Sequence, residues 1–320
     1  MNAIYGAPRG DIRAGALLGH RYRLEQPLGR GAMGQVWQGR DEHLERKVAV
    51  KTVVSELLVE AVEREQAQAR FQREAKAAAA LDHTNIATVH DADISGDVFW
   101  LVMQLVDGAT LATVLDERDR LDPDAAAAAG AQLCSGLAAA HAADLVHRDL
   151  KPENVMVRRD GVVKILDFGL VKLVSDPGPR LTATGMRAGN LLYASPELIG
   201  GSRDLDGRSD LYSVGCLLHH MLTGAPPFPA AGPAALVRAH LTEPPPVLAD
   251  SGVTVPDGLQ ELVHTLLAKD RDDRPASAAE VYAALGPFLP VSAPGADTLR
   301  RFGPEDPRRP FVMPLGPYPV

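Results

Sequence analysis

Two short segments concentrate side chains that can do chemistry: residues 147–154, with the sequence HRDLKPEN, and residues 167–169, with the sequence DFG. The Asp149 carboxylate can accept or orient a hydroxyl proton, and the Lys151 ammonium can neutralise a phosphoryl group in transfer. Asn154 and Asp167 supply hard oxygen ligands of the kind that magnesium prefers. The pattern HRDxKxxN arises by chance on the order of once in a hundred thousand in such a chain. Together the two segments predict a site for metal-assisted phosphoryl transfer.

A glycine-rich segment, GRGAMG at residues 29–34, is a second candidate for contact with phosphates. A dinucleotide-binding loop would need a helix directly after its last glycine. Residues 35–39 instead read as a strand, so a hairpin whose glycine-rich tip covers phosphates fits better. No Gly-Lys-Ser/Thr sequence occurs, which excludes a Walker loop.

Lys51 ends the apolar run Val48-Ala49-Val50-Lys51, which is typical of a buried strand. A buried ammonium needs a partner of opposite charge or it loses its proton. Glu74, in the helix expected at 60–81, is a suitable partner. The alternative is a surface lysine at the edge of a sheet.

The pattern of apolar residues, glycines and prolines predicts the elements that position these groups. We expect strands at 22–28, 35–40, 47–54, 86–94 and 98–105. Beyond the helix at 60–81, we expect helices at 110–116, 123–143, 210–222, 234–241, 257–268 and 277–285. A loop-and-strand region at 145–170 separates the helix at 123–143 from the one at 210–222. Asp122 is the expected N-cap of the helix at 123–143. Residues 1–21 read as a lead-in, and residues 290–320, with eight prolines, as a flexible tail.

Composition narrows the class of protein further. The chain has 33 basic and 41 acidic residues and a formal charge of −8, which argues against a nucleic-acid-binding protein. Cys134 and Cys216 are too few for a disulfide framework and read as buried thiols in a reducing compartment. The alanine-rich stretch 125–146 contains Gln132, His141 and Asp144, so it predicts a buried helix rather than a membrane span. With no signal peptide, we expect a cytoplasmic protein.

Taken in order, the motifs resemble those of Hanks-type protein kinases, in particular the bacterial eukaryotic-like serine/threonine kinases. The resemblance covers residues 22–289. It implies an α+β bilobal fold, with a β-rich N-lobe at 22–105 that holds one main helix and a mainly helical C-lobe at 106–289. It implies ATP bound in the cleft between the lobes, Mg²⁺ as the metal with Mn²⁺ as an alternative, and protein substrates. Lys151, without a tyrosine-kinase pattern in the catalytic loop, favours serine or threonine as acceptor, as in non-specific serine/threonine protein kinases.

The resemblance also implies roles for individual residues. Asp149 would be the catalytic base, Lys151 would neutralise the phosphoryl group, and Lys51, oriented by Glu74, would hold the α- and β-phosphates. Asn154 and Asp167 would bind the metal. The positions that would surround ATP are Leu28, Gly29, Gly31, Gly34, Val36, Ala49, Met103, Gln104, Val106 and Met156. Structural roles would fall to Arg148, Phe168, Gly169, Asn190, Glu197, Asp210 and Arg274. Among these, Glu197 would pair with Arg274 and Asp210 would anchor the catalytic loop.

Two positions in the segment after Asp167 concern regulation. Thr182 and Thr184 are spaced like the autophosphorylated threonines of bacterial relatives, and a phosphate there would pair with Arg148.

Asn190 stands where these kinases usually have a threonine whose hydroxyl bridges the residues equivalent to Asp149 and Lys151. An asparagine amide is longer and differently angled, so we expect reduced but real turnover.

Three other functions fit the sequence less well. A pseudokinase or scaffold would bind nucleotide and signal through partners. Asn190 favours it, and it is disfavoured by the presence of Lys51, Glu74, Asp149, Asn154 and Asp167. A nucleotide-dependent dehydrogenase lacks the strand–glycine–helix context. A small-molecule kinase would usually lack the Ser195-Pro196-Glu197 segment. Related kinases also form homodimers, which the resemblance leaves open for this chain.

Overall fold

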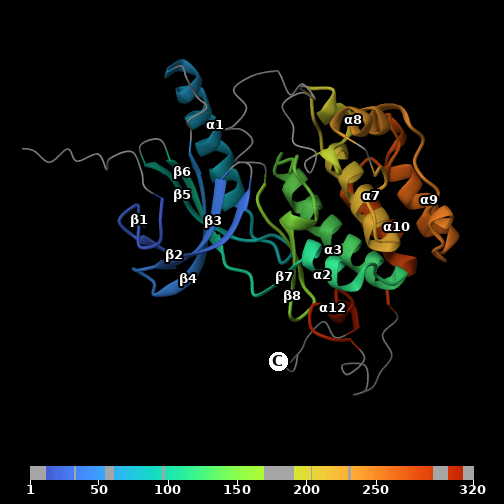
Figure 1. Ribbon diagram of the computed structural model, residues 1–320, viewed down its shortest axis with the longest axis horizontal. Helices are drawn as coiled ribbons and strands as arrows, with labels where there is room; N and C mark the ends of the chain where they lie inside the picture. Colours follow the sequence, from blue (N-terminus) through green and yellow to red (C-terminus); the bar gives the residue numbers. More distant parts are fainter. Residues whose placement is uncertain are drawn as a thin grey trace, which may run out of the picture. The chain divides into compact units, whose positions relative to one another are not determined.

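The structure, a computed structural model, describes residues 12–31, 34–54, 61–95, 98–168, 191–202, 204–229, 232–290 and 302–312. The chain divides into two units. Residues up to Asp82 and Ala87–Val106 belong to the first, and His83–Ile86 and Asp107–Phe168, with the described residues that follow, belong to the second. The first unit is β-rich and the second mainly helical (Figure 1), which confirms the predicted α+β class.

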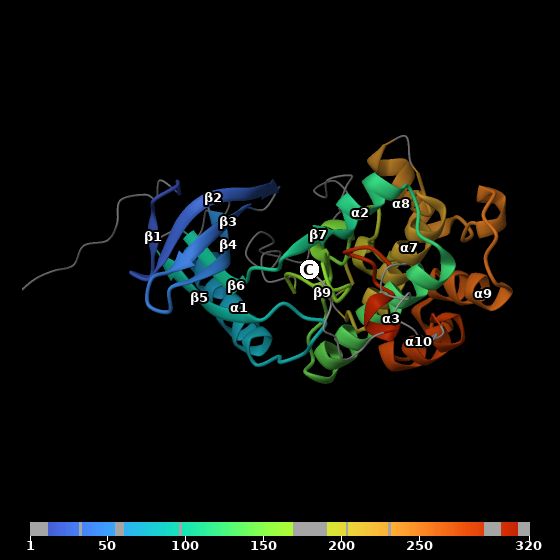
Figure 2. The same cartoon turned by 90° about the horizontal axis from the view of Figure 1, so that it is seen from below.

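One antiparallel sheet forms the framework of the first unit. Its strand order is β1-β2-β3-β4-β6-β5. The bounds are β1 Leu17–Leu18, β2 Tyr22–Gly31, β3 Gly34–Asp41, β4 Arg46–Val54, β5 Val89–Ser95 and β6 Val98–Gln104. Figure 2 shows the strands from a second direction. Strand β1 lies in the expected lead-in: Leu18 is buried and the strand pairs with the start of β2, so this part of the lead-in is folded onto the sheet.

The register gives the two faces of this sheet different tasks. Trp37, Val50 and Val102 lie directly opposite one another on β3, β4 and β6. With Tyr22 and Trp100 they belong to one buried cluster. Because neighbouring residues of a strand point to opposite faces, the intervening positions lie on the other face. That other face carries four of the candidate nucleotide-binding residues, Val36, Ala49, Lys51 and Met103.

Helix α1, Ala61–Ala79, packs on the same face as those residues. Its buried side chains, Ala67, Phe71, Ala75 and Ala78, recur every three or four residues and so form one stripe. Phe71 meets Phe99 of β6 edge to face, with ring centroids 5.2 Å apart. Phe99 and Trp100 are neighbours on β6, so their side chains point to opposite faces of the sheet. Because Trp100 belongs to the buried cluster, α1 lies on the face opposite that cluster.

The second unit is arranged around a buried alanine-rich helix. This helix, α3 (Pro123–Ala142), packs against α7 (Arg208–Thr223) and α10 (Ala278–Leu285). A Cβ atom on Gly130 would lie 2.9 Å from Leu218 and 3.2 Å from Leu285, so the absence of a side chain permits this close packing. The remaining α-helices are α2 Leu111–Arg118, α6 Pro196–Ile199, α8 Pro233–Thr242, α9 Asp257–Leu266 and α12 Arg309–Val312.

Short elements complete the second unit. A three-stranded antiparallel sheet has the order β7-β8-β9, with β7 Gly108–Thr110, β8 Val155–Arg158 and β9 Val163–Ile165. The 3₁₀ turns are η1 Pro152–Asn154, η2 Leu248–Ser251, η3 Arg271–Asp273 and η4 Gly286–Phe288. Cys134 and Cys216 are buried free thiols, as the sequence predicts. Within the described ranges, no helix has the length and apolar character needed to span a bilayer.

Residues 302–312 differ from the flexible tail expected at 290–320. They end in α12 and pack onto the second unit, where Asp306 and Arg309 are only 2% and 4% exposed. Figure 1 shows this segment in red beside α3 and β8. The proline content that suggested a tail does not reveal these contacts, because they join residues far apart in the sequence.

Candidate functional site

The catalytic loop is organised around the imidazole of His147, which is fully buried. Its Nε2 lies 2.7 Å from the carbonyl oxygen of Leu166, and its Nδ1 lies 3.2 Å from the backbone nitrogen of Asp149. A carbonyl only accepts, so Nε2 carries the proton, and Nδ1 is free to accept the N–H of Asp149. A neutral histidine therefore connects Asp149 to the residue that precedes Asp167.

Asp210, near the start of α7, holds the same loop from the other side. Its Oδ2 accepts the backbone N–H of His147 at 2.8 Å, and its Oδ1 accepts that of Arg148 at 2.9 Å. The side chain of His141 also lies 2.8 Å from Oδ2. Burial would by itself raise the pKa of Asp210, but the hydrogen bond from His141 and those from the loop backbone lower it on balance. Asp210 therefore stays ionised and supports a strained backbone, since Arg148 has φ 63°.

The side chains with catalytic potential cluster around Asp149. Lys151 Nζ lies 3.4 Å from Asp149 Oδ2. Asn154 donates from Nδ2 to the backbone oxygen of Asp149 at 2.8 Å and to its Oδ2 at 3.1 Å. The Asp149 and Lys151 side chains are 15% and 19% exposed, so they are partly desolvated but reachable. A carboxylate, an ammonium and an amide thus meet at one point.

Asn154 and Asp167 stand at the two ends of the β8–β9 hairpin. Asn154 precedes β8, Asp167 follows β9 by two residues, and the N–H of Leu166 donates to the backbone oxygen of Asn154 at 2.9 Å. Because the Asn154 nitrogen faces Asp149, its amide oxygen is the atom that can face a cation. Two hard oxygen donors on neighbouring backbone fit a divalent ion such as magnesium. Asp167 has φ 51°, a conformation rare for residues with a side chain.

Four candidate ATP-binding residues of the first unit share one face of the sheet. Val36 lies opposite Lys51, and Ala49 lies opposite Met103. These four positions alternate with the members of the buried cluster, so they lie on the α1 side of the sheet. Gln104 falls on the cluster side, which leaves its main chain for contact with a ligand, as the resemblance implies. Met156 lies on β8 of the second unit.

Lys51 and Glu74 belong to the same unit and the same side of its sheet. Lys51 is half-buried on the central strand β4, and Glu74 is half-buried on α1, three residues after Phe71. Because Phe71 contacts the sheet, the helix turn that carries Glu74 is directed at the face that bears Lys51. The pairing of the two side chains stays a prediction.

The glycine-rich segment is a hairpin, as its strand-like setting predicts. Gly29 lies opposite Val36, and Gly31 opposite Gly34, where β2 turns into β3. Gly34 has φ 146°, and a Cβ atom there would lie 2.1 Å from the backbone oxygen of Thr52. Only glycine fits this position. The preceding Leu28 is 50% exposed.

A buried ion pair ties the segment after the catalytic loop to the body of the second unit. Arg274 donates to both carboxylate oxygens of Glu197, at 2.7 and 2.9 Å. It also donates to the backbone oxygens of Arg208, Ala268 and Lys269. This is the pair expected from the sequence, and the Arg274 side chain is 0% exposed.

The remaining predicted residues are placed only in part. Phe168 is buried, with its ring centroid 5.2 Å from that of His147, and Val106 is buried at the end of the first unit. Gly169, Thr182, Thr184 and Asn190 lie outside the described residues. Sequence reasoning missed the role of His141, because nothing in the local sequence links it to an aspartate 69 residues away.

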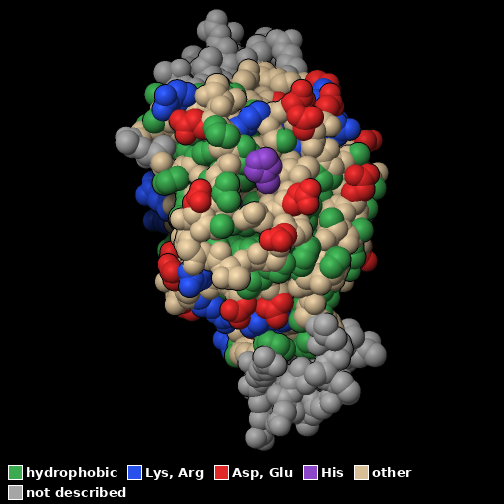
Figure 3. Space-filling model, turned by 90° about the vertical axis from the view of Figure 1, so that its right-hand side faces the viewer, with side chains coloured by type: hydrophobic (Ala, Val, Ile, Leu, Met, Phe, Trp, Pro, Cys, Tyr) green, Lys and Arg blue, Asp and Glu red, His purple; other side chains and the backbone are tan. Residues whose placement is uncertain are grey.

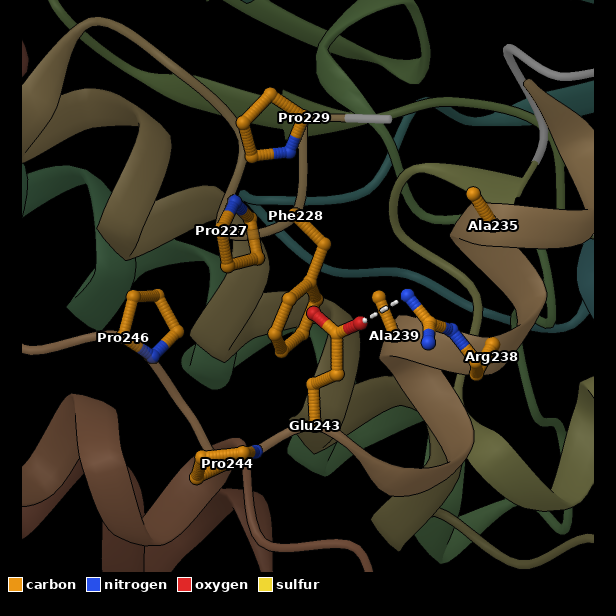
Figure 4. A pocket seen from close by; sticks show the side chains of 9 residues that line it. All are labelled: Pro227, Phe228, Pro229, Ala235, Arg238, Ala239, Glu243, Pro244 and Pro246. Carbon is orange, nitrogen blue, oxygen red and sulfur yellow. Dashed lines mark ion pairs between the residues drawn. The ribbon is translucent and has the colours of Figure 1, made fainter. Parts of the chain in front are cut away.

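The second unit also has a cavity of about 390 Å³ beside α8. Proline and phenylalanine side chains line much of it, and Arg238 and Glu243 form an ion pair of 3.0 Å at one side (Figure 4). None of the candidate catalytic residues lines it, so we do not place the reaction here. On the face of the second unit turned to the viewer in Figure 3, charged side chains of both signs are scattered among apolar ones.

The chain is similar to curated bacterial serine/threonine-protein kinases. The chain is 40% identical over 288 residues to a probable serine/threonine-protein kinase of Streptomyces coelicolor, which covers 87% of this chain and 42% of that protein. It is 38% identical over 287 residues to serine/threonine-protein kinase pkn3 of Myxococcus xanthus, covering 87% and 52%. It is 37% identical over 272 residues to serine/threonine-protein kinase PknB of Mycolicibacterium smegmatis, covering 84% and 43%. The chain thus spans about half the length of these curated relatives.

The family comparison covers both units. The model of the protein kinase domain matches residues 22–284, close to the range of the resemblance and including the glycine-rich hairpin, the catalytic loop and Arg274. The predicted motifs, the β-rich and helical units and this match agree. The chain belongs to the protein kinase domain family.

Proposed function

We propose that this protein is a serine/threonine protein kinase that transfers the γ-phosphoryl group of ATP to serine or threonine hydroxyls of proteins. The observation that carries the proposal is the cluster in which Asp149 meets Lys151 at 3.4 Å and Asn154 at 3.1 Å. The family implies ATP and a divalent cation, and we propose Mg²⁺ as the ion. The names of the relatives support serine and threonine as acceptors.

In this proposal Asp149 orients the acceptor hydroxyl and accepts its proton as the hydroxyl oxygen bonds to the γ-phosphorus. The bond from that phosphorus to the bridging oxygen breaks, and ADP leaves with the electron pair. Lys151 lies beside the carboxylate and neutralises charge on the transferring group. Lys51 would hold the α- and β-phosphates with Glu74 as its partner. Most of the catalytic effect comes from positioning and charge, not from covalent chemistry on the protein.

Asn154 and Asp167 are the residues that would hold Mg²⁺. The ion, when bound, neutralises charge on the phosphate oxygens. Asn154 uses its nitrogen on Asp149 and keeps its oxygen for the ion, so a single side chain connects the base to the metal. An Asn154→Asp variant would lose that donor to Asp149, so we expect its transfer rate to fall more than its nucleotide affinity.

The acceptor is tested by labelling. The protein is incubated with γ-labelled ATP and Mg²⁺, alone and with a generic protein substrate, and the labelled amino acids are identified after hydrolysis. Phosphoserine and phosphothreonine support the proposal, and label on tyrosine alone contradicts it. Tight nucleotide binding without any label favours the pseudokinase or scaffold alternative.

Thr182 and Thr184 are the proposed sites of self-phosphorylation. A phosphate adds nearly two negative charges, and Arg148 beside Asp149 would pair with it. Peptide mapping of the active protein tests whether Thr182 and Thr184 carry phosphate. Label found elsewhere, with both threonines bare, would remove these sites from the proposal.

A further inference from the structure

Residues 302–312 make specific contacts with the second unit that the kinase reaction does not account for. Arg308 Nη1 lies 3.1 Å from Asp122 Oδ2 and 3.0 Å from Asp124 Oδ1, at the start of α3. Its Nη2 lies 2.8 Å from Asp306 Oδ2, and its guanidinium stacks 4.4 Å from the centroid of Phe302. The Arg308 side chain is only 14% exposed. Among its partners Asp306 is buried, whereas the Asp124 and Asp122 side chains are 40% and 73% exposed. Guanidinium–carboxylate contacts gain strength as both groups lose water, so the Arg308–Asp306 contact is the strongest of the three.

Asp122 contacts the segment and not the backbone of its own helix. It occupies the N-cap position of α3, as predicted, yet its side chain makes no capping hydrogen bond. Its carboxylate faces Arg308, 186 residues away in the sequence. The carboxylates of Asp122 and Asp124 at the start of α3 thus form an acidic surface that binds Arg308 of the segment.

Gln132 connects the segment to the β8–β9 hairpin. This side chain is 5% exposed in the alanine-rich helix α3. Its Nε2 donates to the backbone oxygens of Pro307 at 3.0 Å and Gly161 at 3.1 Å. Its Oε1 accepts from Val163 N at 2.9 Å and Asn85 Nδ2 at 3.1 Å. All four hydrogen-bonding positions of the amide are filled. One of these hydrogen bonds, the one to Pro307, is made to the segment.

The turn of the hairpin is shaped to receive the segment. Gly161 has φ 82°, and a Cβ atom there would lie 2.1 Å from the backbone oxygen of Asp306 and 2.9 Å from Arg309 Cβ. The backbone oxygen of Arg159 accepts from Arg309 Nη1 and from the N–H of Glu305. The segment thus contacts the turn at Arg159 and Gly161, and it contacts Gln132 beside the turn.

We propose that residues 302–312 form a strap, docked in cis, that holds the β8–β9 hairpin and thereby fixes the placement of Asn154 and Asp167 at its ends. Arg308 and Gln132 are then positioning residues, since neither touches the reacting atoms. The second part of this inference rests on the proposed function, because it takes Asn154 and Asp167 as the metal-binding pair. Residues that orient metal ligands typically change metal affinity by 10- to 100-fold when lost.

Hydrogen–deuterium exchange of the full chain tests the strap independently of activity. In the wild type, the amides of Glu305, Arg309, Phe311 and Val312 make backbone hydrogen bonds and should be protected. Arg308→Gln should raise exchange in the strap, and in residues 158–163, by about tenfold, as expected for a local opening eased by about 1.4 kcal/mol. The matched control is Arg238→Gln, which removes an ion pair of 3.0 Å at a residue that is 71% exposed. Exchange in α9 reports any global loss of stability.

A glycine pair provides a second, independent perturbation. Gly161→Ala places a methyl group against the strap, whereas Gly252→Ala, at φ 72° with nothing within 4 Å, introduces the same backbone strain alone. We expect Gly161→Ala to release the strap and Gly252→Ala to leave it protected. The same variants are titrated with Mg²⁺ at fixed ADP, and nucleotide binding is read by calorimetry. Arg308→Gln and Gly161→Ala should need about tenfold more Mg²⁺ for half-maximal binding.

Three results would overturn the inference. The first is a wild-type strap that exchanges as fast as a free peptide. The second is release of the strap with unchanged exchange in residues 158–163, and the third is unchanged Mg²⁺ dependence in both variants. A wild type that binds Mg²⁺ and ADP but transfers no phosphate would refute the proposed function and leave the exchange and binding results to decide the strap.

Discussion

The carboxylate of Asp210 accepts the backbone N–H of His147 at 2.8 Å, across 63 residues of sequence. Asp210→Asn would turn an amide N–H toward His141 or toward the loop N–H groups, which are themselves donors. We expect a loss of about 2 kcal/mol of stability, as for hydrogen bonds to a buried charge, and a fall in turnover larger than the change in KM for ATP. Thermal unfolding and steady-state kinetics measure both. Asp272→Asn, at a side chain that is 79% exposed, is the control; equal effects from the two variants would contradict this role.

The Glu197–Arg274 pair should matter for stability far more than the exposed ion pairs do. Glu197→Gln leaves Arg274 buried without its counter-charge, which we expect to cost about 3 kcal/mol. Arg274→Lys should not rescue the site, because an ammonium lacks the two-pronged geometry. Urea unfolding provides the measurement. Asp204→Asn, in a pair whose carboxylate is 88% exposed, should cost less than about 1 kcal/mol.

Stability should fall as the pH drops below about 6.5, in part because of His240. Burial, with the positive charge of Lys269 nearby, lowers the pKa of His240 to about 3. The unfolded chain takes up a proton near pH 6.5 while the folded protein does not, so acid favours unfolding, by about 1.5 kcal/mol between pH 6.5 and 5. His240→Gln should flatten this part of the curve. The control is His264→Gln, at an exposed histidine. If His240→Gln kept the wild-type dependence of stability on pH, His240 would not be its cause.

The reaction centre was predictable because its residues are adjacent in sequence. Asp149, Lys151 and Asn154 lie in one loop, and their types already specify the chemistry. The residues that hold them in place were harder to predict from the sequence. His141 and Gln132 lie on an alanine-rich helix, and their contacts are set by tertiary packing. Asp122 illustrates the limit, since its N-cap position was predicted but its carboxylate binds Arg308, 186 residues away, instead of the helix.

Asn190→Thr should raise turnover if the asparagine is a poor substitute for the hydroxyl usual at this position. The residue lies outside the described part of the chain, so the expectation comes from the motif alone. We expect an increase of several-fold in turnover, with nucleotide affinity unchanged, because the hydroxyl would contact Asp149 and Lys151 and not ATP. Asn190→Ser introduces the same hydroxyl without the methyl group of threonine, so it tests the hydroxyl alone. No rise in either variant would remove this explanation.

The most direct test of the proposed function compares wild type with Asp149→Asn at equal nucleotide occupancy. The rate measured is transfer of labelled γ-phosphate to the chain and to a generic serine/threonine substrate, with Mg²⁺ present. Loss of the general base should lower the rate by about 10² to 10⁴, while calorimetry shows ATP still bound. Wild-type rates in Asp149→Asn, or no transfer by the wild type despite bound ATP, would contradict phosphoryl transfer at Asp149.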